Sequence, residues 1–205
     1  MELTQRELDN FKKLYPRDMQ LQIVTLDEIA ECTDGGTIDW SKVNLGGVSD
    51  AALLTASDPS CGMAIGYVVF DAICLFIGAA SLRSSLTAKC AADIGEAAKP
   101  VEAALQQYIE VLMDDKSSTT AIAGAVFNIV STIYSGGCLG AVLSAMFGNL
   151  SWYQNALYGA TALGTIMAAL ATDGAAEIGM LVVELATAGF LVNDSITCAR
   201  ACKYN

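Results

Sequence analysis

The amino-acid sequence predicts an all-α protein, a helical bundle with apolar helical hairpins at its centre and a small mixed N-terminal segment. Three observations predict it. Apolar residues make up 54% of the chain and charged residues only 16%. Residues 117–172 contain no charged side chain, and residues 86–113 carry apolar side chains at helical spacing. Because a helix that is apolar on every face lies inside a bundle or inside a membrane, the sequence raises the question of what covers these helices.

The length of 205 residues suits one core better than two full domains. We expect residues 1–58 to form a polar N-terminal segment and residues 59–205 to form the apolar helical bundle. Charge is unevenly placed between the two parts: five basic residues lie in the first quarter of the chain, whereas none lies between Lys116 and Arg200.

The N-terminal segment begins with a predicted surface helix. Thr4 and Glu7 have capping-box spacing, apolar residues follow at helical spacing, and Pro16 ends the helix. In residues 19–23 apolar side chains alternate with glutamines, which predicts a half-buried strand. A second capped turn is expected at residues 25–32, and residues 37–40 are expected to pair back as another short strand.

A long apolar helix is expected over residues 62–82, with Asp58 as its N-cap and Pro59 in its first turn. At 1.5 Å per residue it would span about 32 Å, which is enough for a bilayer. Asp71 is its single charged residue. An unpaired carboxylate at a bilayer centre costs about 2.5 to 3.5 kcal/mol, so Asp71 needs a partner, solvent or a proton. The cations expected to pair with it are Arg83, Lys89 and Lys99.

Residues 86–113 predict a water-facing amphipathic helix that is kinked or split at Pro100, because proline removes a backbone donor and crowds the preceding turn. In the charge-free stretch, breaks are expected at residues 135–137 and 149–155. They leave pieces of which the first two are shorter than the roughly 17 to 25 residues of a spanning helix. A final helical hairpin is expected from residues 156–172 and 175–195, joined at Asp173-Gly174.

Small residues recur at intervals of four in this stretch: Ala156, Ala160, Gly164 and Ala168 form one set, and Gly136 and Gly140 form another. A helix face without large side chains lets another backbone approach closely, as in small-xxx-small pairs within membranes. Soluble bundles use the same residues at tight helix crossings, so the spacing allows both interpretations.

The composition excludes several classes of function. With 22 acidic residues, 11 basic residues and no histidine, the net charge of −11 argues against a nucleic-acid partner. Without histidine there is no Ser-His or Cys-His pair and no imidazole metal ligand. Neither a phosphate-binding loop nor a dinucleotide-binding motif is present. We therefore expect no enzymatic activity, no cofactor and no metal.

The seven cysteines are an odd number in largely apolar surroundings, which predicts free thiols in a reducing compartment. Cys198 and Cys202 lie one helical turn apart but lack two further ligands, so we interpret them as thiols and not as a zinc site. The N-terminus does not have the pattern of a signal peptide. Synthesis in the cytosol is expected, followed by release or by association with a membrane.

The first functional hypothesis is a soluble helical protein that inserts apolar helices into a lipid bilayer and forms a pore or lesion, as an oligomer on the membrane. In layout alone, and with no sequence motif behind it, such a bundle resembles the pore-forming domains of colicins and other helical toxins. An acid-sensitive set would lower the cost of entering lipid on protonation: Asp71, Asp173, Glu177 and Glu184.

Two alternatives remain open at this stage. One is a small integral membrane protein, in which Trp152 and Tyr153 would lie at the membrane interface. The other is a soluble bundle that binds an apolar ligand or the apolar helix of a partner protein. The expected partner is thus a lipid bilayer or an apolar ligand.

Overall fold

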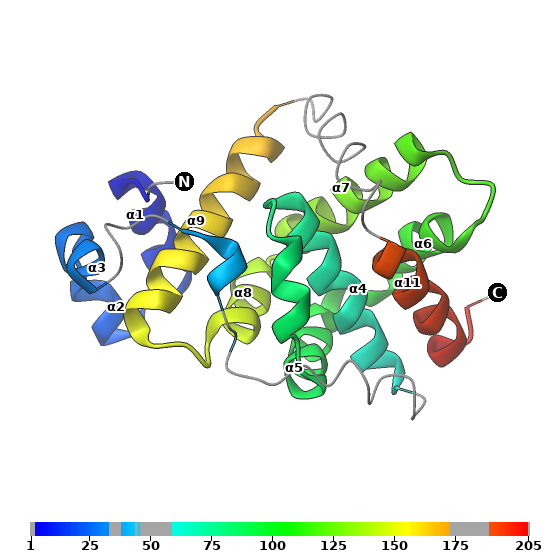
Figure 1. The fold of residues 1–205 in the computed structure, drawn as a ribbon, viewed down its shortest axis with the longest axis horizontal. Helices are drawn as coiled ribbons and strands as arrows, with labels where there is room; N and C mark the ends of the chain where they lie inside the picture. Colours follow the sequence, from blue (N-terminus) through cyan, green and yellow to red (C-terminus); the bar gives the residue numbers. More distant parts are fainter. Residues whose placement is uncertain (1–2, 33–37, 44, 46–58, 173–188, 205) are drawn as a thin grey trace.

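The computed structural model describes residues 3–32, 38–43, 45, 59–172 and 189–204, and over these residues the protein is a helical bundle without a strand. The N-terminal helices and α9 form one end of the molecule, α6 and α11 form the other, and α4, α5 and α8 lie between them (Figure 1). The prediction of an all-α bundle is confirmed.

The α-helices of the described part are α1 (Gln5–Leu14), α2 (Met19–Ile23), α3 (Leu26–Cys32), α4 (Cys61–Phe76), α5 (Ala88–Ala98), α6 (Glu102–Met113), α7 (Thr119–Ser135), α8 (Leu139–Phe147), α9 (Trp152–Leu170) and α11 (Gly189–Cys202). Short 3-10 helices are η1 (Trp40–Lys42), η3 (Ala80–Ser85) and η4 (Lys99–Val101).

Helix α1 begins with the predicted capping box, in which Thr4 and Glu7 satisfy each other's backbone N–H groups. The strand expected at residues 19–23 is wrong, because this segment is helix α2. Asp18 supplies the reason: its carboxylate accepts a hydrogen bond from the backbone N–H of Leu21 at 3.0 Å and so caps a helical turn. Five residues of alternating polarity could not distinguish the two structures.

The second expected strand, at residues 37–40, is also wrong in its described part. Ile38 and Asp39 lie in coil, and Trp40 begins η1 after an Asp39 cap. Trp40 packs between α8 and α9, with its ring centroid 6.3 Å from that of Phe147 and 5.7 Å from that of Tyr158. This part of the N-terminal segment therefore contributes an aromatic contact to the bundle.

Helix α4 is shorter than predicted, because it covers residues 61–76 and not 62–82. Ser60 is its N-cap and accepts from the backbone N–H of Met63, so Pro59 lies before the helix. At its end Gly78 takes a positive φ of 68°, which glycine adopts at little cost, and the chain continues into η3. Every residue from Ala64 to Leu75 is buried, which makes α4 the central helix.

The predicted interruption of residues 86–113 is confirmed. Helix α5 ends at Ala98, Pro100 lies in η4, and α6 begins at Glu102. Helix α5 packs against α4 and α8, whereas α6 packs against α7 and α11. The amphipathic region therefore covers two of the charge-free helices.

Helices α7, α8 and α9 follow the predicted breaks in the charge-free stretch. Gly136 is the C-cap of α7, and Gly137 has a positive φ of 72° before α8 begins. None of the described helices is by itself long and apolar enough to cross a bilayer. Helices α7 and α8 meet that requirement only as a pair, across a bend of 105°. The second arm of the hairpin predicted at residues 175–195 lies mostly outside the described residues.

Candidate functional site

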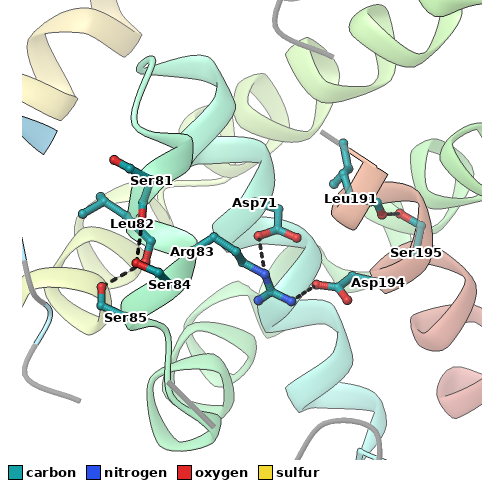
Figure 2. A network of polar contacts seen from close by, with 9 residues as sticks. All are labelled: Asp71, Ser81, Leu82, Arg83, Ser84, Ser85, Leu191, Asp194 and Ser195. Atoms are coloured by element: carbon teal, nitrogen blue, oxygen red, sulfur yellow. Dashed lines mark hydrogen bonds and ion pairs between the residues drawn. The ribbon is translucent and has the colours of Figure 1, made fainter. Parts of the chain in front are cut away.

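A buried ionic cluster joins three elements of the bundle (Figure 2). Asp71 projects from the middle of α4, Arg83 from η3 and Asp194 from α11. The Arg83 Nε lies 3.5 Å from Asp71 Oδ1, and the Arg83 Nη2 donates to Asp194 Oδ2 at 2.5 Å. One guanidinium is therefore shared between two carboxyl groups that are 123 residues apart in sequence, since 194 − 71 = 123.

One aromatic ring contacts Arg83, and two nearby serines form hydrogen bonds within their own elements. Tyr67, one turn before Asp71 on α4, lies under the guanidinium, with 5.1 Å between the Arg83 Cζ and the ring centroid. In η3 the Ser85 hydroxyl donates to the carbonyl of Leu82 at 2.9 Å. In α11 the buried Ser195 hydroxyl donates to the carbonyl of Leu191 at 2.8 Å. Figure 2 shows both serines bonded within their own elements, away from the carboxyl groups.

The two carboxyl groups are not equivalent. Asp71 is fully buried, and neither of its oxygens accepts a hydrogen bond from the described residues. Burial raises the pKa of Asp71 well above its ordinary value; Arg83 offsets this effect only in part, and the neighbouring Asp194 raises the pKa further. The shorter contact of Arg83 goes to Asp194. The cluster therefore combines a close Arg83–Asp194 ion pair with a longer Arg83–Asp71 contact, and Asp71 holds its proton more strongly than an ordinary carboxyl group.

The partner predicted for Asp71 is thus found, since Arg83 was among the three expected cations. Lys89 instead pairs with Asp93 on the surface of α5, and Lys99 of η4 pairs with Glu96 of α5. Asp194 was missed as the third member, because nothing local in the sequence connects α11 with residue 71. Asp173, Glu177 and Glu184, the other acid-sensitive candidates, lie outside the described residues.

A second feature missed by the sequence analysis is the contact between α4 and α5. A methyl group on Gly66 would overlap the carbonyl oxygen of Ala91, and one on Gly95 would overlap the carbonyl oxygen of Gly62. The backbones of α4 and α5 are therefore in direct contact at two places, and on each helix the two contacting residues are four positions apart. The sequence carries this signal as Gly62-xxx-Gly66 and Ala91-xxx-Gly95, the spacing associated with close helix pairs.

The small residues that were singled out have separate surroundings. On α9, Ala156 and Ala160 are buried, and Gly164 lies against the Glu7 side chain of α1. Ala168, further along the same face, is exposed. This face is therefore covered by α1 over part of its length.

The second set of small residues does not form a ridge. Gly136 ends α7 and lies against Val101, whereas Gly140 belongs to α8 and lies against Leu14. The two glycines lie on either side of the predicted break, because Gly137 separates α7 from α8. Tyr15 of α1 donates to the carbonyl of Gly140, which attaches α1 to α8.

The aromatic pair expected at an interface opens α9. Trp152 is 42% exposed, and its ring meets that of Tyr153 edge to face at 5.6 Å. Ser151 and Gln154 form a capping box around this helix start. The exposed indole lines a small cleft of about 70 Å³ where α1, α8 and α9 meet, together with Phe11, Tyr15 and Ala156.

The prediction of seven free thiols is wrong for two of them. Cys61, the first residue of α4, is joined by a disulfide to Cys202, the last residue of α11. The free cysteines with described side chains are all buried: Cys74, Cys90, Cys138 and Cys198. No local pattern indicates this pairing, because the two partners are 141 residues apart in the chain.

Comparison with family models, curated proteins and solved structures gave no match to this chain. Among the described residues no three Cys, Asp or Glu side chains are grouped as ligands for a metal ion. The cluster of Asp71, Arg83 and Asp194 can hold a proton and connect α4 to η3 and α11.

Proposed function

We propose that this protein is a water-soluble helical bundle that transfers its charge-free helices into a lipid bilayer and there forms a pore or lesion. The observation that supports this most is the folded-back pair α7 and α8. The pair contains no charged side chain and passes the length and hydropathy requirement for a membrane span only when both helices are taken together.

The dimensions explain why the pair would have to open. At 1.5 Å per residue, the 17 residues of α7 measure about 26 Å and the 9 residues of α8 about 14 Å. A hydrocarbon core is about 30 Å thick, so neither helix is long enough alone. Straightening the bend at Gly136-Gly137 would produce one apolar helix of sufficient length.

The bend itself depends on one backbone conformation. Gly137 has a φ of 72°, and a methyl group on it would meet nothing within 4 Å. Glycine adopts this positive φ at little cost, so the bend itself carries little backbone strain. The bent state is then held by the packing of α7 against α4 and α6 and of α8 against α5 and α9, and loss of that packing would allow a straight form.

Amphipathic helices cover the charge-free helices from the outside. Helix α1 covers α9, α5 covers α8, and α6 covers α7. If these helices move to a membrane surface, the small-residue face of α9 loses its cover from Glu7 and Phe11. That face would then be free to pack against a second copy in lipid, which supports an oligomer on the membrane.

The proposal is tested by dye release from lipid vesicles with the purified full chain. We expect release by protein obtained without detergent, and a different rate at about pH 5, where carboxyl groups begin to neutralise, than at about pH 7. Protein that is recovered only from detergent-extracted membranes would instead support the integral membrane alternative. Soluble protein that releases no dye from neutral or anionic vesicles at either pH would refute the proposal.

Binding of an apolar ligand is the second candidate, and one observation favours it. A cleft of about 740 Å³ lies between α1 and α9. Tyr134, Met167 and Leu170 form an apolar side, and Arg6 and Glu7 form a charged side. This arrangement would suit an acyl chain with a polar head. Native mass spectrometry that finds a bound lipid, on a protein inert toward vesicles, would favour this function.

A further inference from the structure

Three cysteines meet at the end of α11. The Cys202 sulfur is bonded to that of Cys61, and the Cys198 sulfur lies 3.9 Å from the Cys202 sulfur. Cys198 is fully buried, whereas Cys61 and Cys202 are partly exposed. One carboxylate is also present, because Glu102 Oε1 of α6 lies 3.6 Å from the Cys61 sulfur. The Cys202 sulfur is thus within reach of two alternative partners.

Helix geometry permits the alternative bond. Residues one turn apart at i and i+4 have Cα atoms about 6 Å apart, inside the range of about 4.4 to 6.8 Å that a disulfide bridges. Their Cβ atoms are about 5 to 6 Å apart in a regular helix and have to approach to about 4.5 Å or less, so the bond requires the last turn of α11 to adjust. Cys202 is the last residue of α11, and the chain leaves the helix at Lys203 with a positive φ of 58°. The sulfur that has to move therefore belongs to a helix end, where small backbone adjustments cost least.

We infer that Cys198, Cys202 and Cys61 form a thiol–disulfide exchange site, in which the disulfide moves from a bond between α4 and α11 to a bond within α11. The Cys198 sulfur, as a thiolate, attacks the Cys202 sulfur. The bond from Cys202 to Cys61 breaks, and its electron pair goes to the Cys61 sulfur. Cys61 then takes up the proton that Cys198 gave up. One disulfide and one thiol are present before and after, so no oxidant or reductant is consumed.

The surroundings explain why the bond between the helices persists at rest. Burial, together with the carboxylates of Glu102 and Asp194, raises the pKa of Cys198 to about 12. The attacking thiolate is therefore scarce while α11 is packed. Loosening of α11 would hydrate Cys198 and increase its thiolate population. On the product side, the new Cys61 thiol can donate to the Glu102 carboxylate beside it.

The consequence for the fold is that α4 and α11 lose their covalent connection. They would then be held together by packing and by the cluster of Asp71, Arg83 and Asp194. Only this consequence, easier opening of the bundle at a membrane, rests on the proposed function. The exchange itself is a property of the three cysteines and needs no lipid.

The positions of lysine and arginine make the two bonds easy to distinguish. Trypsin places Cys61 in the peptide Val43–Arg83, Cys198 in Ser117–Arg200 and Cys202 in the tripeptide Ala201–Lys203. The full chain is incubated without reductant in urea below its unfolding transition, blocked with a thiol-alkylating reagent and digested without reduction. We expect Ala201–Lys203 to move with time from Val43–Arg83 to Ser117–Arg200.

Two variants serve as controls in this mapping. Cys198→Ser removes the attacking thiol, so we expect the exchanged species to be lost completely and the bond to Cys61 to remain. Cys138→Ser removes the other cysteine of the same tryptic peptide and should leave the exchange unchanged. The inference is overturned if the wild type keeps Ala201–Lys203 attached to Val43–Arg83 throughout, or if the exchanged species persists in Cys198→Ser.

A second experiment tests whether Cys198 and Cys202 can form a disulfide when the bond between Cys61 and Cys202 is absent. In Cys61→Ser, a small disulfide oxidant should form the bond between Cys198 and Cys202, seen as Ala201–Lys203 attached to Ser117–Arg200. Recovery of Cys202 only as a mixed disulfide with the oxidant would contradict the inference. Exchange without dye release would refute the proposed function alone. Dye release without exchange would refute the exchange site alone.

Discussion

Replacement of Asp71 by asparagine tests the protonation of the buried cluster. Asp71 is fully buried and its pKa is raised well above its ordinary value, mainly by desolvation. The folded protein therefore keeps a proton there that the unfolded chain, with an ordinary pKa of about 3.9, releases. Between these two pKa values the native state binds more protons, so the free energy of unfolding falls as the pH rises. Asparagine has nearly the same shape, stays neutral and removes this dependence.

The expected size follows from proton linkage. Each pH unit inside that window lowers the wild-type free energy of unfolding by about 1.4 kcal/mol through this one group. Asp71→Asn should therefore have the same free energy of unfolding as the wild type near about pH 4. As the pH rises toward the native pKa, the variant should become increasingly more stable than the wild type. Below the unfolded pKa the stabilising protonation is complete, so the two curves should run parallel there.

The assay is urea unfolding followed by circular dichroism at several pH values between about 4 and 8. Asp93→Asn is the matched control, because Asp93 is an exposed carboxylate that pairs with Lys89 on the surface of α5. We expect its effect to stay within about 0.5 kcal/mol at every pH. Equal pH slopes for wild type and Asp71→Asn would refute the reasoning, because they would mean that Asp71 is ionised in the folded protein.

Three further changes have expected outcomes. Arg83→Met leaves the carboxyl groups of the cluster without their cation and should lower the free energy of unfolding in urea by about 3 to 5 kcal/mol, with part of this stability recovered in acid. A decrease that is the same at all pH values would contradict this. Gly66→Ala inserts a methyl group against a backbone carbonyl of α5 and should lower the free energy of unfolding by about 1 to 3 kcal/mol. Gly62→Ala is the control, because its methyl group meets open space and should not destabilise the protein. Equal melting temperatures for these two variants would disprove the close contact. Gly137→Ala penalises the bent form by about 1 to 2 kcal/mol and should both lower the melting temperature and speed dye release, while Gly124→Ala, in open space within α7, should do neither.

The local features of the fold were predictable because their causes lie within a few residues. The Thr4–Glu7 capping box, the interruption at Pro100 and the break at Gly136-Gly137 each follow from a short motif with a known backbone consequence. The strand predicted at residues 19–23 was wrong, although its pattern was also local. The alternation there was real, but the cap from Asp18 determined the conformation.

The candidate site was predictable only in part, because its members come from distant segments. The cost of burying Asp71 required a partner, and the nearest cation in sequence, Arg83, supplies it. The contribution of Asp194 and the bond between Cys61 and Cys202 depend on α11 returning to α4, which no local pattern encodes. The close contact at Gly66 was visible as spacing, but a similar spacing also occurs at Gly136 and Gly140, where no common helix exists.

The most direct test of the proposed function is the depth reached by α7 in a bilayer. Tyr134 is 43% exposed and lies near the end of α7, just before the bend. Tyr134→Trp, combined with Trp40→Phe and Trp152→Phe, places a single indole at that position, and vesicles with bromine atoms at different depths report its location by quenching. We expect the strongest quenching from the deepest bromines, with emission shifted to the blue. Emission that stays unchanged, with no quenching at any depth, would contradict it.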